Sequence, residues 1–438
     1  MKRLQMAPEE ADIVDLTHAA EGVARIDGKT VFVADSLPGE RVVLRRTHRQ
    51  RKLDYAVTEQ VLRASPDRVQ PKCPHFGVCG GCALQHLAPE AQLAFKQSQL
   101  IENLSRLGAV EAGRLLEPLR GPVWNYRRRA RLGIKLVPRK GKVLVGFRER
   151  SSPYVADLHE CHVLVEPVGA LITPLGQMVE SLTIASRVPQ AEVAVSDDIV
   201  ALVLRVLDPP APADLERLAA FESEFSVRIY LQSGGPDTIA PLDPSCAQAP
   251  LSYRLTDHDI TIDFEPTDFI QINGALNQAM IARALDVLAP QAGATVLDLF
   301  CGLGNFSLPL ARRTGQVVAV EGDAGLVQRA RGNAERNGIT NAEFHVADLF
   351  KDVAGLPWTR RPYDSVLLDP PRAGAREILP VVAGSGARRV VYISCHSGSL
   401  ARDAGLLVRE HGFRLTAAGV MDMFPHTTHV EAMAVFDR

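Results

Sequence analysis

The sequence lacks any long apolar run. None of its 438 residues belong to a stretch that approaches the roughly 18 apolar residues a membrane-spanning helix requires. The first residues, Met1–Glu10, also lack the apolar centre of a secretory signal peptide. We therefore expect a cytoplasmic protein without membrane association that acts as a monomer.

Cysteine is too scarce and too unevenly spaced for a disulfide framework. The seven cysteines are an odd number in a long chain without export signals, so metal binding or catalysis accounts for them better. A large net charge is also absent, because the formal value is −2. One local exception runs from Arg120 to Arg150, where eleven basic residues accompany a single acid, Glu149.

Short strands with turn residues between them fill residues 8–66. Asp27-Gly28 separates two apolar segments, which is a strong signal for a two-residue hairpin turn. So many short strands in so few residues predict a small β-barrel. Six basic residues follow on or after one strand and form either a polyanion-binding rim or a solvated charged edge: Arg41, Arg45, Arg46, Arg49, Arg51 and Lys52.

A group of cysteines follows the prolines that end this pattern. Cys73, Cys79 and Cys82 are separated by five and two residues, and Cys161 lies far along the chain. Four thiolates hold either zinc or an iron–sulfur cluster, and spacing alone does not decide between the two. A site closed by four protein ligands favours a structural or RNA-positioning role over redox catalysis.

Helix and strand patterns alternate from about residue 267, which predicts a doubly wound, largely parallel sheet. Its strands are expected at Thr295–Phe300, Val317–Glu321, Glu343–Ala347, Ser365–Asp369 and Arg389–Ile393, with closing strands near Leu415–Met421 and His429–Phe436. The predicted fold class is α/β. A β-barrel at 8–66 precedes an α+β central domain at 67–265 and a Rossmann-like catalytic domain at 266–438, and residues of about 93–123 could pack with the catalytic domain.

A glycine turn, Gly302-Leu303-Gly304, follows the first of these strands, with Asn305 as the expected helix cap. The dinucleotide fingerprint is incomplete because Ser307 takes its last position. Glu321 ends the next strand, where an acid either accepts the ribose hydroxyls of a cofactor or merely caps a helix. Asp348 follows the third strand, near an adenine edge. Acids at successive strand ends, without a pyrophosphate cradle, fit S-adenosylmethionine better than NAD.

Cys395 follows the strand Arg389–Ile393, at the sheet edge where open α/β folds bind ligands. Asp369-Pro370-Pro371-Arg372 resembles the motif of amino-directed methyltransferases, which need no cysteine. Carbon 5 of a pyrimidine does need one, because a thiolate must first add at carbon 6 to make an enolate. Glu431 is the candidate base for the carbon 5 proton. The plainer alternatives are an inert core thiol and a structural acid.

Together these residues resemble the RNA 5-methyluridine methyltransferases, and within them the branch acting on 23S ribosomal RNA. The resemblance covers essentially the whole chain. It is carried by Leu37-Pro38-Gly39-Glu40, Cys73–Cys82, Asp298–Asn305, Asp369–Gly374, Leu400–Asp403 and Phe424–Glu431. One departure is that the family commonly has Ser-Cys-Asn-Pro where this chain has Ser394-Cys395-His396-Ser397.

The resemblance implies S-adenosylmethionine-dependent methylation of carbon 5 of a uridine in a single-stranded or loop region of 23S rRNA. It implies that Cys395 is the nucleophile and Glu431 the base, and that the N-terminal barrel is an OB-like TRAM domain. A [4Fe-4S] cluster on four cysteines and six cofactor contacts are implied as well: Cys73, Cys79, Cys82, Cys161, Gln271, Phe300, Asn305, Glu321, Asp348 and Asp369.

Two other functions are compatible with the pattern. A transfer-RNA 5-methyluridine enzyme would use the same chemistry, but the simple members of that branch lack the barrel and the cluster. A non-catalytic iron–sulfur RNA-binding factor on an inactive methyltransferase fold would not need Cys395, Glu431 and the cofactor acids together.

Overall fold

The computed structural model describes residues 7–438, which form two compact units. The first contains the described residues up to Lys96 together with Phe147–Ala156 and Phe424–Thr428. The second contains Gln97–Gly146, Asp157–Met423 and His429–Arg438. Within the described residues, no helix is both long and apolar enough to cross a membrane.

The first unit contains the predicted barrel. Its five strands close in the order β1-β2-β3-β5-β4, and they span Glu9–Leu16, Gly22–Ile26, Lys29–Ala34, Arg41–Arg49 and Leu53–Arg63 in chain order. Asp27 and Gly28 connect β2 to β3 with φ values of 50° and 76°, which suits a two-residue hairpin. Alternate side chains such as Val31, Val33 and Leu44 form the barrel core. The prediction of a small barrel is confirmed.

A buried carboxylate joins the barrel to the segment after it. Glu40 accepts hydrogen bonds from the backbone of Leu37 (2.8 Å) and Ser65 (3.2 Å), and it pairs with Arg68 at 2.5 Å. Burial alone would raise the pKa of Glu40, but these hydrogen bonds and the Arg68 charge lower it below its ordinary value. Glu40 of the Leu37–Glu40 motif therefore links the barrel to the segment that contains Ser65 and Arg68.

A six-stranded sheet in the second unit fills a region for which the sequence predicted no topology. Its strand order is β11-β10-β9-β8-β6-β7. The helices α2 (Ile172–Ser181) and α3 (Pro212–Phe225) contact β7 and β10 of this sheet, respectively. The strands β6 to β11 span Arg129–Val137, Lys142–Gly146, Gln190–Val195, Val200–Arg205, Val227–Gln232 and Ile239–Pro241. The hairpin of β12 (Leu251–Leu255) and β13 (Ile260–Phe264) follows it.

The seven-stranded sheet of the second unit has the order β16-β15-β14-β17-β18-β20-β19. Strands β14 to β18 are parallel to one another, and β20 is antiparallel to both β18 and β19. In chain order the strands β14 to β20 span Thr295–Leu299, Gln316–Glu321, Ala342–Val346, Ser365–Leu368, Arg389–Ser394, Arg414–Met421 and Glu431–Asp437. The predicted, largely parallel sheet is confirmed.

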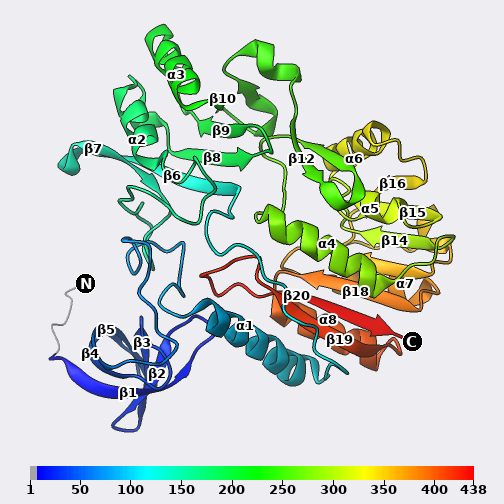
Figure 1. Ribbon diagram of the computed structural model, residues 1–438, viewed down its shortest axis with the longest axis horizontal. Helices are drawn as coiled ribbons and strands as arrows, with labels where there is room; N and C mark the ends of the chain where they lie inside the picture. Colours follow the sequence, from blue (N-terminus) through cyan, green and yellow to red (C-terminus); the bar gives the residue numbers. More distant parts are fainter. Residues whose placement is uncertain (1–6) are drawn as a thin grey trace. The chain divides into compact units, whose positions relative to one another are not determined.

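Helices pack against this sheet (Figure 1). They are α4 (Gly274–Leu288), α5 (Ser307–Ala311), α6 (Ala324–Arg336), α7 (Leu379–Gly384) and α8 (Ser397–Arg409). The helix α5 begins one residue later than a cap at Asn305 would place it, because its N-cap residue is Phe306.

The outer edge of β19 is covered by an upstream segment. Backbone N–H groups of Gly113, Arg114, Leu116 and Leu119 donate to carbonyls of β19 over distances of 2.8–3.1 Å. This pairing satisfies an edge that would otherwise offer unpaired groups to another chain.

The helix that follows Cys395 packs unusually closely against another backbone. A one-turn π-helix, Leu104–Gly108, continues from α1 (Pro89–Asn103), and a side chain at Gly405 of α8 would place its Cβ 2.6 Å from the carbonyl oxygen of Gly108. Only a residue without a side chain allows this contact, so Gly405 helps to fix α8.

The same substitution is expected to have opposite effects in two helices. Gly405→Ala should lower the free energy of unfolding by about 1–3 kcal/mol, because the methyl group overlaps backbone. Gly332→Ala in α6 has no neighbour within 4 Å and should raise it by about 1 kcal/mol through helix propensity. Urea denaturation of the two full-length variants checks both signs, and a neutral Gly405→Ala would contradict the packing argument.

Candidate active site

Three predicted residues meet at the carboxyl edge of the seven-stranded sheet. Asp369 follows β17, Cys395 follows β18, and Glu431 begins β20. Since Ser394 pairs with Ala432 in the antiparallel ladder, the residues one step further, Cys395 and Glu431, lie at the same end of adjacent strands. Parallel strands with one antiparallel insertion thus bring a thiol and two carboxyl groups together.

Burial raises the pKa values of Glu431, Asp369 and Cys395, so it disfavours their charged forms. It raises the pKa of Glu431, which is 3% exposed, well above its ordinary value, and the charge of Asp369 adds to the effect. Burial also raises the pKa of Asp369 to about 7. The pKa of the Cys395 thiol rises to about 11 through burial and then through Glu431 and Asp369, while Arg372 opposes the shift. Each group therefore lies within electrostatic reach of the others.

The glycine turn after β14 has three left-handed positions, at alternate residues. Phe300, Gly302 and Gly304 have φ values of 64°, 55° and 90°. The turn presents the Gly302 N–H to the carboxylate of Glu321 at 3.1 Å. Glu321 also accepts from Gly322 (2.7 Å) and Asp323 (3.1 Å), so its carboxylate has a fixed orientation and about one of its roughly four acceptor positions remains.

Asp298 lies beneath this turn and is fully buried. Its Oδ2 accepts a hydrogen bond from the hydroxyl of Ser307, which explains why Ser suits the position where dinucleotide-binding turns have Gly or Ala. Burial, and then the nearby Asp369 and Glu321, raise the pKa of Asp298 to about 7. The acids around the turn therefore create a region of negative potential.

Asn305 does not cap α5, so that prediction is wrong. The helix begins at Ser307, and its N-cap residue Phe306 makes no side-chain cap. The amide of Asn305 instead exchanges two hydrogen bonds with Asn277 of α4, both 2.9 Å, and its Oδ1 also accepts from the Tyr253 hydroxyl at 3.0 Å. This network fixes the end of the glycine turn against α4 and β12.

Sequence reasoning missed a buried arginine behind the same network. The Arg128 guanidinium lies 4.4 Å from the centroid of the Tyr253 ring, and its Nε donates to the carbonyl of Gln271 at 3.0 Å. Burial lowers the pKa of Arg128 and raises that of Tyr253 to about 12. No local motif marks Arg128 within its basic stretch, because its partners lie more than a hundred residues away.

The remaining predicted cofactor residues lie around the turn. Gln271 is largely buried (9% exposed) in the loop before α4. Asp348 is exposed after β16, and the Phe350 N–H donates to its Oδ1 at 3.1 Å. The ring centroids of Phe350 and Phe300 lie 5.8 Å apart. The hydrogen bonds of Asp348 with Phe350 and Lys351 lower its pKa.

His396 caps the helix that follows Cys395. Its Nδ1 accepts a hydrogen bond from the Ser399 N–H at 3.1 Å, and its φ of −147° is typical of an N-cap residue. Asn is also a favoured N-cap, which explains how His396 replaces it after Cys395. Burial, then Arg372 and Arg402, lower the pKa of His396 and so favour the neutral ring that the cap requires.

The four cysteines of the predicted cluster divide between the two compact units. Cys73, Cys79 and Cys82 belong to the first and Cys161 to the second. The Gly81 N–H lies 3.4 Å from Cys79 Sγ, a contact that suits a thiolate. Within residues 7–438, no group of three or more His, Cys, Asp or Glu side chains could hold a metal ion.

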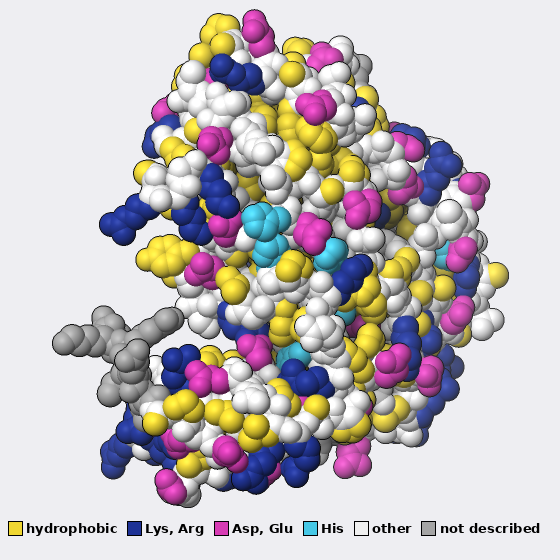
Figure 2. Space-filling view, turned by 60° about the vertical axis from the view of Figure 1, so that its left-hand side comes forward, with side chains coloured by type: hydrophobic (Ala, Val, Ile, Leu, Met, Phe, Trp, Pro, Cys, Tyr) yellow, Lys and Arg dark blue, Asp and Glu magenta, His cyan; other side chains and the backbone are white. Residues whose placement is uncertain are grey.

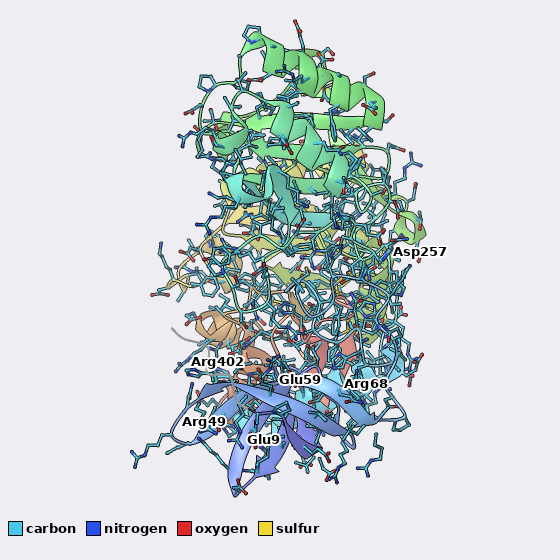
Figure 3. The ribbon with its side chains drawn as sticks, turned by 90° about the vertical axis from the view of Figure 1, so that its left-hand side faces the viewer. Glu9, Arg49, Glu59, Arg68, Asp257 and Arg402 are labelled. Atoms are coloured by element: carbon cyan, nitrogen blue, oxygen red, sulfur yellow. The ribbon has the colours of Figure 1, made fainter. Side chains whose placement is uncertain are left out.

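The six cations predicted for the barrel rim differ in their partners. Arg41, Arg45 and Arg46 form ion pairs with Glu10, Glu59 and Glu9, respectively. Arg49, whose position is labelled in Figure 3, is exposed, as are Arg51 and Lys52. Elsewhere on the surface in view, Lys and Arg are interspersed with Asp and Glu (Figure 2). Half of the predicted rim is thus neutralised by the protein itself.

The sheet order, the glycine turn after β14 and the acids at the following strand ends define the fold of S-adenosylmethionine-dependent methyltransferases. Residues 248–438 match a family model described as tRNA (Uracil-5-)-methyltransferase. The crystal structure of a Pyrococcus abyssi tRNA (uracil-54, C5)-methyltransferase in complex with S-adenosyl-L-homocysteine shares the fold. It is 24% identical with a TM-score of 0.75, covering 98% of this chain and 99% of that one.

Two bacterial relatives are similar over the full length. A 23S rRNA (uracil(1939)-C(5))-methyltransferase RlmD from Alkalilimnicola ehrlichii is 52% identical over 437 residues, covering 100% of this chain and 98% of that protein. An RlmD from Stenotrophomonas maltophilia (strain K279a) is 51% identical over 439 residues with the same coverage. The chain therefore belongs to the RlmD family of 23S rRNA (uracil-C5)-methyltransferases, as its motifs predicted.

The variant Glu431→Gln is expected to lower the pKa of Cys395 from about 11, because it removes a neighbouring negative charge at almost constant volume. The rate of iodoacetamide alkylation of Cys395, followed by peptide mass spectrometry as a function of pH, reports this pKa since only the thiolate reacts. The control Glu410→Gln lies at the opposite end of α8 and should behave like wild type. An unchanged or higher pKa in Glu431→Gln would contradict the geometry.

Proposed function

We propose that this protein methylates carbon 5 of a uridine in 23S rRNA, using S-adenosylmethionine and a covalent bond between Cys395 and the base. The observation that carries the proposal is the meeting of Cys395, Glu431 and Asp369 at one sheet edge. The names of the full-length relatives support the 23S substrate. The target uridine must leave its stack to reach a half-buried thiol, which favours loop or single-stranded RNA.

The acids beside the glycine turn suit a cationic cofactor. The charges of Asp369 and Glu321 add to burial in raising the pKa of Asp298, and a ligand with positive groups would offset this repulsion. S-adenosylmethionine supplies an electrophilic methyl group on a positive sulfonium and carries an ammonium group. We assign it Gln271, Phe300, Asn305, Glu321, Asp348 and Asp369, and the side chain of Asn305 acts mainly by holding the turn, since Asn277 and Tyr253 engage it.

The chain's own groups account for the proton and bond changes at the base. Cys395 reacts in the thiolate form, a minor form at neutral pH because its pKa is about 11, and the thiol proton is lost to solvent. The thiolate forms a bond to carbon 6, the carbon 5–carbon 6 double bond opens, and the resulting enolate makes carbon 5 nucleophilic. Carbon 5 takes the methyl group as the bond from that methyl to the sulfonium sulfur breaks, which would leave a neutral thioether, S-adenosylhomocysteine. The Glu431 carboxylate then takes the proton from carbon 5. The double bond then re-forms and the carbon 6–sulfur bond breaks, which returns the thiolate and leaves the proton on Glu431.

A 23S rRNA fragment with 5-fluorouridine at the target should trap the enzyme, because fluorine cannot leave carbon 5 as a proton does. Wild type is expected to give an RNA–protein adduct stable in denaturing gels, and Cys395→Ala none. Glu431→Gln should accumulate an adduct even with unmodified RNA, since the carbon 5 proton stays in place.

Cys246→Ala is the matched control, because Cys246 lies in the short helix Pro244–Gln248, outside the glycine turn and the proposed cysteine ligand set. It should form the adduct at the wild-type rate. If Cys395→Ala forms as much adduct as wild type, the proposed covalent mechanism through Cys395 is wrong. Methylation of transfer RNA but not of 23S RNA would instead remove the assigned substrate.

We also propose that Cys73, Cys79, Cys82 and Cys161 bind a [4Fe-4S] cluster with a structural role. The support is the cysteine spacing, the resemblance of the motif to that of the family, and the N–H contact to Cys79 Sγ. No step of the methyl transfer requires this cluster.

Protein purified without oxygen is expected to contain about four iron and four acid-labile sulfide per chain, as a [4Fe-4S] cluster requires. Cys79→Ser should lose most of both, whereas Cys246→Ser, outside the proposed ligand set, should retain them. Stoichiometric zinc in place of iron, measured by elemental analysis, would overturn the assignment.

A further inference from the structure

An exposed tyrosine stands on a well-ordered hairpin in the first compact unit. Tyr154 is 71% exposed, whereas most aromatic side chains of a folded protein are largely buried. It belongs to the segment Phe147–Ala156, which folds back on itself through the bridge between Arg148 and Val155. Leaving a large ring in water forgoes the stabilisation that burial would give, so its position calls for another explanation.

The backbone around Tyr154 is held on both sides. The Glu149 N–H donates to the Tyr154 carbonyl at 2.9 Å, and the Tyr154 N–H donates to Ser152 Oγ at 3.2 Å. The hairpin is tied in turn to the cysteine loop, because Arg150 N–H donates to the Val78 carbonyl and Gly80 N–H to the Arg148 carbonyl, both at 2.8 Å. The backbone that carries the ring is therefore held by hydrogen bonds on both sides.

The two arginines of the hairpin have different roles. Arg150 is committed to the protein, since it forms an ion pair with Asp35 at 2.7 Å and lies 5.7 Å from the ring centroid of Phe76. Arg148 is exposed, and among the described residues it forms no ion pair; its NH1 reaches only the Pro153 carbonyl at 3.5 Å. An exposed cation thus lies on the same hairpin as the exposed ring, with its guanidinium at the carbonyl of Pro153, the residue before Tyr154.

We propose that Tyr154 and Arg148 form a contact site for single-stranded RNA, where an unpaired base stacks on the Tyr154 ring and Arg148 contacts a phosphate. An aromatic face next to a cation is the combination that binds single strands with little sequence preference. Val78, which is 57% exposed, adds an apolar side chain on the loop that is hydrogen-bonded to this hairpin. The proposal rests on RNA being the substrate, as proposed above, and assigns part of its binding to this hairpin.

Fluorescence anisotropy of the full-length protein with a labelled, unmodified single-stranded 23S rRNA fragment tests the site. Tyr154→Ala should weaken binding by roughly 5- to 150-fold, the range that corresponds to the loss of one base–aromatic stack. Tyr154→Phe keeps the ring face and should bind within about twofold of wild type. Arg148→Ala should reduce the slope of log affinity against log salt by about 0.7, the contribution of one phosphate contact.

The controls separate this proposal from the assigned reaction. Leu215→Ala removes another partly exposed side chain, on α3, and should leave RNA affinity unchanged. Calorimetry with S-adenosylmethionine should give equal affinities for wild type and Tyr154→Ala, which also shows that the variant is folded. If wild type methylates the RNA and Tyr154→Ala binds it equally well, the contact site is refuted alone; if wild type does not bind the RNA, both proposals fail.

Discussion

The pairing register of β18 with β20 is the constraint on which the candidate site depends. Ser394 lies opposite Ala432, and this places the residues after β18 and at the start of β20 beside each other. Successive side chains of a strand point to opposite faces, so a shift by one residue would turn Glu431 to the other face of the sheet. The buried apolar residues of β20, Ala432 to Phe436, oppose such a shift because every one of them is at most 4% exposed.

The same edge concentrates negative charge in a poorly solvated environment. Two carboxyl groups, Asp298 and Asp369, have pKa values raised to about 7, and the pKa of Glu431 is raised well above its ordinary range. Folding alone does not favour this arrangement, since buried acids without cationic partners destabilise a protein. The simplest physical reason for such a cluster of buried acids is that it binds a ligand. A positively charged cofactor would supply the missing opposite charge.

The sequence predicted those parts of the structure that depend on short segments. Buried parallel strands are apolar runs, so the ends of β14, β15, β17 and β18 could be located within about two residues, and with them Glu321, Asp369 and Cys395. Asp27-Gly28 predicted its hairpin because both residues readily adopt the positive φ angles of a two-residue turn. Hydrogen bonds between distant residues could not be predicted. Tyr253, Asn277 and Asn305 meet only in the folded chain, where the Asn305 side chain is bonded to the other two and does not cap α5.

The order of strands at the β19 edge has a consequence for assembly. β20 follows β19 along the chain but lies between β19 and β18 in the sheet. β19 therefore does not pair with β18, the strand that precedes it in the chain, and joins the sheet only through β20. Until β20 enters, β19 can be held by the segment around Gly113–Leu119, which was synthesised some three hundred residues earlier. Such non-local pairing carries a high loop-closure entropy and is slow. The strand that fills the gap between β19 and β18 is also the one that carries Glu431, so the sheet edge described above is complete only when this non-local pairing has formed.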